Sequence, residues 1–353
     1  MGSPQKTMLA CQVVEFHKDY VIHQVPIPAE LGPHDLLLKV AAASLCHTDS
    51  MVVEGRMAGV TLPVTASHEG AGKVVAKGDD VQGFDLGDRV LAGIPRNRCG
   101  QCQDCSSQDP QYCSSRDGGI GFQLDGAFAE YLVVDSRNAC HIPDDLDHIS
   151  AAPMACAGIT AWRALIQANV GNGQWLGVVG SGGGLGHLAL KFAKAQGIRV
   201  IGVDARDEGL DLTREAGAEV VVDARKGREA VVAEVHSVTA GQGVDATINF
   251  SEAVSAAGLA CAITRKHGGM IQVAQAKVVI PFRELIFRDI KVSGSLTGSP
   301  KQTQEMLNFA ARHGIGVQTQ VYQGLERIPD LVKDAHSGKI KGKGIVVVDA
   351  TIR

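Results

Sequence analysis

Four cysteines lie close together in one polar segment of this 353-residue chain. Their spacing is Cys-x2-Cys-x2-Cys-x7-Cys, and they are Cys99, Cys102, Cys105 and Cys113. Four neighbouring thiolates suit tetrahedral Zn²⁺ and leave no coordination position for a substrate. An iron–sulfur cluster also takes four cysteines, but the run typical of such clusters has proline after its last cysteine, where Ser114 stands here. The pattern predicts a structural zinc site, with four independent thiols as the remaining alternative.

A second group of candidate ligands is dispersed along the chain. Cys46 begins the run Cys-His-Thr-Asp, His68 begins His-Glu-Gly, and Cys156 begins Cys-Ala-Gly-Ile-Thr. Two thiolates and one imidazole match a catalytic zinc whose fourth position stays open to water or substrate oxygen. Taken singly, Cys156 reads equally well as a packed thiol and His68 as a core or surface histidine.

A glycine-rich run, Gly-Ser-Gly-Gly-Gly-Leu-Gly, lies between a strand-like segment and a helical one. In that context it predicts a dinucleotide site, with the pyrophosphate at the free N–H groups of the helix. Ser181 replaces the first glycine of Gly-x-Gly-x-x-Gly. We expect Gly183 to let the backbone approach the pyrophosphate and Gly186 to let the helix pack on the strand. The candidate cofactor contacts in this run are Gly180, Gly182, Gly183, Gly184, Leu185 and Gly186.

Asp204 ends the next strand-like run, 21 residues beyond Gly183. An acid at this place hydrogen-bonds the adenosine ribose and repels a 2′-phosphate, so the sequence favours NAD over NADP. Arg206 follows two residues later. It either softens that preference or is a solvated charge at the start of a helix.

Strand-like and helical runs alternate in the second half of the chain, which predicts a doubly wound parallel sheet. We expect strands at 175–179, 199–204, 220–223, 244–249, 270–274 and 290–294, and helices at 185–196, 208–216, 227–239 and 252–262. In the first 150 residues, short apolar runs at 8–16, 35–43, 72–76 and 129–134 predict a β-rich domain. After Ser295 we expect a helix at 302–312 and a strand at 344–350.

Composition excludes several classes of partner. A formal charge of −4 gives no basic field for nucleic acid or an anionic membrane. No secretory signal pattern and no run of 18 apolar residues is seen. Nine cysteines, an odd number, favour metal ligands and buried thiols over a disulfide framework. We expect a cytoplasmic protein that acts on a small molecule.

Taken in order and with these intervals, the motifs resemble the zinc-dependent alcohol dehydrogenases of the medium-chain dehydrogenase/reductase superfamily. The interval from Cys113 to Cys156 and the run from Ala151 to Leu165 resemble especially the tetrameric yeast type. The resemblance implies an α/β protein with two zinc ions and NAD, assembled as a homotetramer. It also implies a GroES-like catalytic domain at 1–156 with a zinc lobe near 96–116, a Rossmann domain at 157–294, and a return to the catalytic domain at 295–353.

The same resemblance implies roles for individual residues near the catalytic zinc. Cys46, His68 and Cys156 hold the metal, and Glu69 approaches it from behind; a structural salt bridge is the alternative for Glu69. Thr48 accepts the proton of the alcohol. Asp49 hydrogen-bonds His68, with helix capping as the alternative.

The cofactor residues implied by the resemblance lie in several segments. His47 contacts the pyrophosphate, unless it is simply a surface histidine, and Thr160 contacts the nicotinamide. Val273 is a further cofactor contact. Lys343 lies near a late pyrophosphate-binding arginine of the family, although the motif fits here only with a shift.

Two departures from the family pattern bear on chemistry. Met51 stands where many members have a histidine that ends a proton relay, so a proton must leave through ribose hydroxyls or water. Val53, Met57 and Val60 occupy the stretch in which ethanol-preferring enzymes place tryptophans. A wider pocket is expected, with alcohols larger than ethanol as substrates.

The sequence therefore predicts an NAD-dependent zinc alcohol dehydrogenase that interconverts primary or secondary alcohols with aldehydes or ketones. A zinc polyol dehydrogenase of the same superfamily is an alternative, disfavoured because such enzymes commonly place a glutamate ligand where Cys156 stands. A non-catalytic zinc- and nucleotide-binding scaffold is the alternative from a different class.

Overall fold

The computed structural model describes residues 6–107 and 109–352. The chain divides into two compact units, one of Met1–Cys156 with Gly298–Arg353 and one of Ala157–Thr297. The first unit is thus built from both ends of the chain. Among the described residues, no single helix is long and apolar enough to cross a membrane, and only a bent pair (His148–Ala155 with Ala157–Ala168) passes that test jointly.

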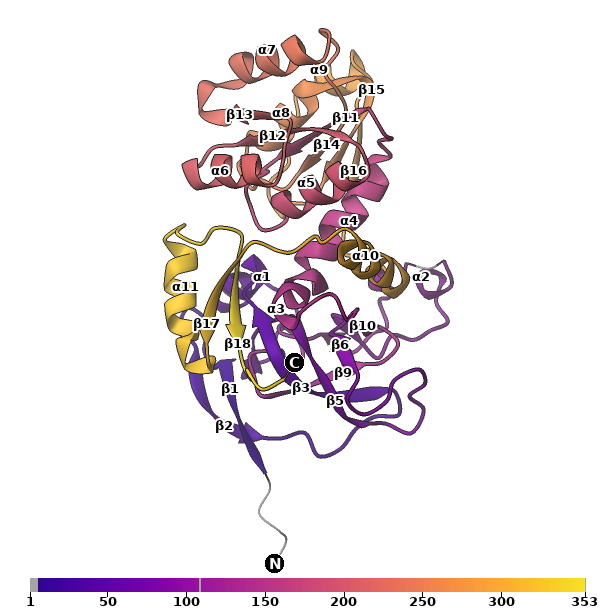
Figure 1. Cartoon of the computed structure of the whole chain (residues 1–353), viewed down its shortest axis with the longest axis vertical. Helices are drawn as coiled ribbons and strands as arrows, with labels where there is room; N and C mark the ends of the chain where they lie inside the picture. The colour runs from indigo at the N-terminus through magenta and orange to yellow at the C-terminus, as the bar shows by residue number, and fades with distance from the viewer. Residues whose placement is uncertain (1–5, 108, 353) are drawn as a thin grey trace, which may run out of the picture. The chain divides into compact units, whose positions relative to one another are not determined.

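The first unit is a β-rich domain built around the long strand β3 (Asp35–Ser44). Nine of its ten residues are buried, so β3 reads as a continuous apolar run rather than an alternating one. Its main sheet has the order β10 (Cys140–His141), β6 (Arg89–Leu91), β5 (Glu69–Lys77), β3, β18 (Lys343–Val347) and β17 (Thr319–Gln323), with β9 (Tyr131–Asp135) paired to β3 (Figure 1). The C-terminal strand β18 lies directly against β3, which joins the two ends of the chain in one sheet.

Smaller elements complete this unit. A second sheet has the order β2 (Val21–Pro26), β1 (Thr7–Val13) and β4 (Val64–Thr65), and β7 (Pro95–Arg96) pairs with β8 (Gly118–Gly119). The helices are α1 (His47–Val53), α2 (Gln103–Ser106), α3 (His148–Ala151), α10 (Pro300–Arg312) and α11 (Ile328–His336), with short 3₁₀ turns η1 (Pro110–Tyr112), η2 (Ala152–Ala155) and η4 (Leu325–Arg327). Ser299 begins α10 with a capping box to Gln302 and a proline in the first turn.

The second unit is the predicted doubly wound sheet, and that prediction of fold class is confirmed. Six parallel strands lie in the order β13 (Val220–Asp223), β12 (Arg199–Asp204), β11 (Trp175–Val179), β14 (Val244–Asn249), β15 (Thr264–Gln272) and β16 (Lys291–Gly294). The helices are α4 (Ala157–Ala168), α5 (Gly186–Ala195), α6 (Asp207–Glu215), α7 (Arg228–Val238), α8 (Ala256–Ile263) and α9 (Phe282–Ile286), with the 3₁₀ turn η3 (Ala224–Lys226).

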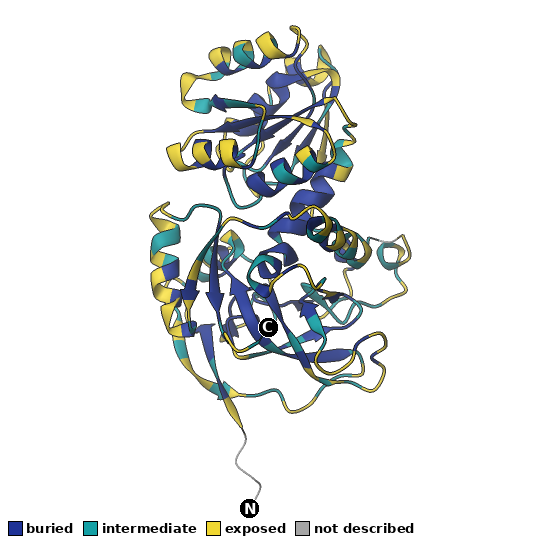
Figure 2. Ribbon diagram, in the orientation of Figure 1, coloured by how far each residue is buried: buried dark blue, intermediate teal, exposed yellow. Residues whose placement is uncertain are grey.

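Helices cover both faces of this sheet. α7, α8 and α9 pack on one another and α4, α5 and α6 on the opposite side, as Figure 1 shows. All five residues of the central strand β11 are buried, in keeping with a parallel strand covered twice (Figure 2). From β11 the chain adds β12 and β13 on one side and then β14, β15 and β16 on the other, so the strand order switches between β11 and β14. Ligands bind such sheets at the carboxyl ends of the strands near that switch.

Candidate active site

The dispersed candidate ligands come together from three segments, each next to the end of a helix or strand. Cys46 precedes α1, His68 directly precedes β5, and Cys156 follows η2. One ligand atom from each, together with a carboxylate oxygen of Glu69, lies within 4.8 Å of the others. His68 and Glu69 are 2% and 0% exposed. The structure thus brings the dispersed residues into one compact donor set, in which His68 and Glu69 are buried and the two cysteines are partly exposed.

The electrostatics of this cluster call for a cation. Hydrogen bonding from Cys156 holds the pKa of Cys46 well below its usual range. Burial opposes the charged form of His68, but the nearby Cys46 thiolate raises its pKa to about 9. Burial raises the pKa of Glu69 to about 7. The His68 Nδ1 atom is buried without a hydrogen-bond partner among the described residues. The two thiols and the imidazole fit Zn²⁺ with one coordination position left open, and the Glu69 carboxylate lies beside them.

Asp49 accepts hydrogen bonds from the backbone next to two of the candidate ligands. Its carboxylate accepts the N–H groups of Cys46 at 2.8 Å and Ser67 at 2.9 Å. Its Oδ1 lies 3.9 Å from Nδ1 of His68, beyond hydrogen-bond distance. Burial raises the pKa of Asp49 to about 6. Asp49 thus fixes the two segments that carry Cys46 and His68, including the start of α1, which is the helix-capping alternative named above.

Lys343 lies in this cluster rather than on an open surface. It is 6% exposed, and its Nζ contacts Oε2 of Glu69 at 2.6 Å and donates to the carbonyl of Leu45 at 2.7 Å. Burial opposes the charge of Lys343, but the Glu69 carboxylate raises its pKa. The ammonium is therefore committed to Glu69, and the salt bridge named as the alternative for Glu69 is formed.

Two residues near His68 were missed by sequence reasoning. Ser67 adopts a left-handed φ of 70° and is fully buried, with Oγ donating to the carbonyl of Ser44. A non-glycine residue in this region stores strain that the surroundings must hold. Phe122 packs its ring edge-on to His68, with centroids 6.0 Å apart. The left-handed backbone of Ser67 and the contact between Phe122 and His68 are visible only in the structure, because neither has a signature in the local sequence.

The remaining residues near α1 take different positions. Oγ1 of Thr48 lies 3.9 Å from Sγ of Cys46, and His47 is exposed. Met51 is buried. Val53, Met57 and Val60 pack with Leu62 and Phe122 in one apolar cluster. Thr48 therefore lies beside the donor set, and Phe122 connects the apolar cluster to it through the ring contact with His68.

The four cysteines of the second motif also converge. One sulfur from each of Cys99, Cys102, Cys105 and Cys113 lies within 4.8 Å of the others. The N–H groups of Gln101 and Cys102 lower the pKa of Cys99 to about 6, whereas burial and the neighbouring thiols raise that of Cys105 to about 12. Four sulfur atoms this close together fit a tetrahedral zinc ion and leave it no open coordination position.

Two buried carboxylates anchor the segment that carries these cysteines. Asp35 accepts two hydrogen bonds from Arg96, and Asp135 accepts the N–H of Asn97 and the guanidinium of Arg137. Both aspartates are fully buried on β3 and β9. The lobe is thus tied to the main sheet by charge-assisted bonds.

The glycine-rich run in the second unit forms a tight turn before α5. Gly180 has a φ of 80°, and a side chain at Gly186 would come within 2.2 Å of the Gly180 carbonyl oxygen. Ser181 is tolerated because its hydroxyl is buried against Thr213 Oγ1 at 2.7 Å. The turn brings Gly180, Gly183 and Asp204 to a pocket of about 420 Å³.

Asp204 organises this pocket. Its Oδ2 accepts the N–H of Gly182 at 2.9 Å, and its Oδ1 accepts those of Ala205 and Arg206. Three backbone N–H groups therefore fix the orientation of this carboxylate at the wall of the pocket. Thr160 is buried in the first turns of α4, and the N–H of Val273, after β15, donates to Asn249. The structure brings the loop and Asp204 together, whereas Thr160 and Val273 do not line this pocket.

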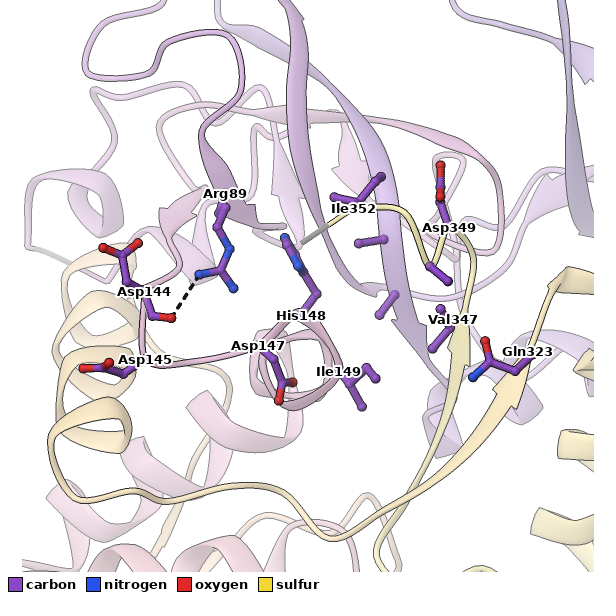
Figure 3. Close-up of a pocket in the computed structure, with 13 residues that line it drawn as sticks. Arg89, Asp144, Asp145, Asp147, His148, Ile149, Gln323, Val347, Asp349 and Ile352 are labelled. Carbon is purple, nitrogen blue, oxygen red and sulfur yellow. Dashed lines mark hydrogen bonds between the residues drawn. The ribbon is translucent and has the colours of Figure 1, made fainter.

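A separate hollow of about 580 Å³ lies in the first unit. Figure 3 shows Arg89, Asp144, His148 and Asp349 at its wall, with Arg89 donating to the carbonyl of Asp144. None of the candidate site residues lines it. The chemistry predicted from the sequence does not map to this hollow.

A doubly wound sheet with a glycine-rich turn, joined to a β-rich domain carrying two sets of thiol ligands, defines a zinc-type dehydrogenase. Known proteins agree. Residues 32–144 match the alcohol dehydrogenase GroES-like domain, and residues 184–312 match the zinc-binding dehydrogenase domain. An alcohol dehydrogenase of Geobacillus stearothermophilus is 34% identical over 341 residues, covering 95% of this chain and 98% of that protein.

Solved structures give the same result. The alcohol dehydrogenase of the archaeon Aeropyrum pernix has a TM-score of 0.88 and 28% identity, over 96% of this chain and 99% of the other. A cinnamyl alcohol dehydrogenase of Sorghum bicolor has a TM-score of 0.87 and 26% identity, over 97% and 98% of the two chains. The chain belongs to the zinc-dependent alcohol dehydrogenases of the medium-chain dehydrogenase/reductase superfamily, and the predicted enzyme class is confirmed.

Proposed function

We propose that this enzyme exchanges a hydride between NAD and alcohols larger than ethanol, at a zinc ion held by Cys46, His68 and Cys156. The single observation that carries the proposal is the convergence of these ligand atoms within 4.8 Å of one another, in a buried cluster beside Thr48. When bound there, zinc supplies Lewis-acid chemistry that favours loss of a proton from an alcohol and polarises a carbonyl.

The chain's own residues supply the proton path and the shape of the pocket. Oγ1 of Thr48 is the hydroxyl that accepts the alcohol proton, and Met51 carries no titratable group to pass it on. As Thr48 accepts the alcohol proton it passes on its own hydroxyl proton, which leaves through ribose hydroxyls or water. Val53, Met57, Val60 and Phe122 form an apolar wall without tryptophan.

The apolar wall sets the expected substrate class. Each additional buried methylene contributes about 0.8 kcal/mol, about fourfold in binding if it is retained in the transition state. Benzyl alcohol and C4 to C6 alcohols should exceed ethanol in kcat/KM by about tenfold or more. A steady-state panel that follows NADH absorbance tests this, with Thr48→Val as the variant expected to lose turnover for every alcohol. Ethanol as the best substrate would contradict the proposal.

Cofactor geometry supports a preference for NAD. The Asp204 carboxylate, held by three backbone N–H groups, stands where it accepts from the ribose hydroxyls and repels a 2′-phosphate. We assign the glycine-rich turn to the pyrophosphate, and His47, Thr160 and Val273 to further cofactor contacts.

We further propose a homotetramer in the cytoplasm. The edge strand β16 is exposed along its length, and the exposed apolar residues Phe282, Ile286 and Phe287 lie on the adjoining α9. An open edge beside an apolar patch favours pairing with a second copy. Light scattering should show smaller species for Phe287→Asp but not for Leu86→Asp, an equally exposed site of the first unit. None of the nine cysteines, all of which lie among the described residues, is in a disulfide, which fits a reducing compartment.

A further inference from the structure

Two arginines stand beside Asp204 in the cofactor pocket. Arg206 and Arg225 both line it. β12 and β13 are parallel with Asp204 opposite Asp223, so Arg225, two residues further on, emerges at the same edge of the sheet. An arginine near the ribose is the group that accommodates a 2′-phosphate in NADP enzymes. By residue type alone, this pocket could accept either cofactor.

Arg225 is already held by two carboxylates. Its Nε donates to Oδ1 of Asp223 at 2.9 Å and its Nη2 to Oδ2 of the same residue at 2.8 Å. The same Nη2 donates to Oδ1 of Asp207 at 2.7 Å. Asp223 also accepts the backbone N–H of Arg225 at 2.9 Å. The guanidinium is therefore fixed in orientation and its charge is more than offset.

Asp207 and Asp223 place their negative charges on the side of Arg225 that faces away from the cofactor pocket. A second hollow of about 320 Å³ is lined by Asp207, Asp223 and Arg225, so Arg225 forms part of the wall between this hollow and the cofactor pocket. A phosphate that approached the Arg225 guanidinium would also meet the Asp207 and Asp223 carboxylates that bind it. The other two cations at the second hollow, Arg214 and Lys226, are each paired with a carboxylate of their own. Repulsion by the two carboxylates would offset the attraction of the guanidinium.

Arg206 is directed elsewhere. Its Nη2 donates to the Gly182 carbonyl at 3.3 Å, and its Nε lies 3.6 Å from Oδ1 of Asp204. It therefore neutralises Asp204 in part and braces the glycine-rich turn. The charge that decides whether a 2′-phosphate is tolerated thus lies at Arg225 and its partners.

We propose that Asp207, Arg225 and Asp223, here called the Arg225 clamp, form a second determinant of cofactor choice that acts beside Asp204. The clamp holds an arginine at the ribose end of the pocket, but its two carboxylates offset the attraction of the guanidinium for a 2′-phosphate. This inference rests on the proposed preference for NAD. It assigns Asp207, a residue that does not line the cofactor pocket, a positioning role in that preference.

Asp207→Asn tests the clamp with little risk to folding, because the Asp207 side chain is 78% exposed. Dissociation constants of NADH and NADPH are measured by nucleotide fluorescence on the zinc-loaded protein at low salt, with 2′-AMP and 5′-AMP as competing probes. We expect Asp207→Asn to tighten NADPH and 2′-AMP by about three- to fivefold, the upper part of the range for one exposed ion pair, and to leave NADH and 5′-AMP within about twofold.

Two further variants isolate Arg225 as the cause. Asp207→Asn combined with Arg225→Gln should lose the gain. Asp211→Asn removes the same charge from the same helix, where Asp211 pairs with Arg214 at 2.7 Å, and should leave NADPH affinity unchanged. An unchanged NADPH affinity in Asp207→Asn, a gain that survives Arg225→Gln, or an equal gain in Asp211→Asn would each overturn the clamp. Failure of the wild-type protein to bind NADH more tightly than NADPH would instead contradict the proposed function.

Discussion

At the scale of single residues, the donor set depends on partners that are distant in the sequence. Cys46, His68 and Cys156 could be nominated from their motifs, but the contact between Lys343 and Glu69 could not, because it joins residues 274 positions apart through the pairing of β18 with β3. The motif around Lys343 suggested a phosphate contact; packing instead gives its ammonium to a buried carboxylate. Such a partner is decided by tertiary structure, which spacing does not encode.

Lys343→Met should destabilise the protein because it leaves the buried Glu69 carboxylate without its cation. Breaking a buried pair in this way costs about 3–5 kcal/mol, whereas removing both charges costs much less. Urea unfolding should therefore rank Lys343→Met well below both the wild type and the double variant Lys343→Met with Glu69→Gln. Strictly additive effects of the two substitutions would show that the pair is not coupled.

At the scale of elements, four strands of the parallel sheet were predicted to their bounds. β11, β12, β13 and β14 begin and end where the sequence predicts, since each has a short, mainly apolar run that β12, β13 and β14 end with an aspartate or asparagine. β15 begins at Thr264 rather than at the expected 270, because its first half is polar and partly exposed. α8 begins at Ala256 rather than at 252, since Asn249 holds the N–H of Ser251 in a turn.

The short helix α3 contributes a pH-dependent stability. Burial, with help from Arg89 and Lys73, lowers the pKa of His148 to about 4. Between that value and the unfolded pKa of about 6.5 the unfolded chain binds a proton that the folded chain does not. Stability should therefore fall as the pH drops from about 6.5 to 4, by up to about 3 kcal/mol from this group.

His148→Gln should remove this contribution to the fall in folding stability between pH 6.5 and 4, while keeping a hydrogen-bond donor for the Gly72 carbonyl. Unfolding free energies of both proteins, measured at several pH values with matched zinc content, would reveal the difference. The prediction fails if the two proteins lose stability in parallel between pH 6.5 and 4.

At the scale of the whole molecule, the chain has two clusters of metal-ligating side chains, to which we assign different roles. The four-cysteine lobe has no open position and is tied to the sheet by Asp35 and Asp135, so its zinc should contribute folding free energy. The Cys46 cluster is placed beside Thr48 and an apolar wall, so its zinc should contribute chemistry. The fold class, the four-cysteine set and the nucleotide loop were accessible from the sequence because each has a local signature. The dispersed set of Cys46, His68 and Cys156 has none, and only the family resemblance singled it out.

The most direct test of this division is zinc content measured on the same samples as NADH formation from benzyl alcohol, for the wild type, Cys46→Ser and Cys102→Ser. We predict two zinc ions per wild-type chain. Cys46→Ser should keep about one zinc and a wild-type unfolding midpoint while losing turnover, whereas Cys102→Ser should unfold at markedly lower denaturant concentration. Retained turnover in Cys46→Ser, or equal loss of stability in both variants, would contradict the account.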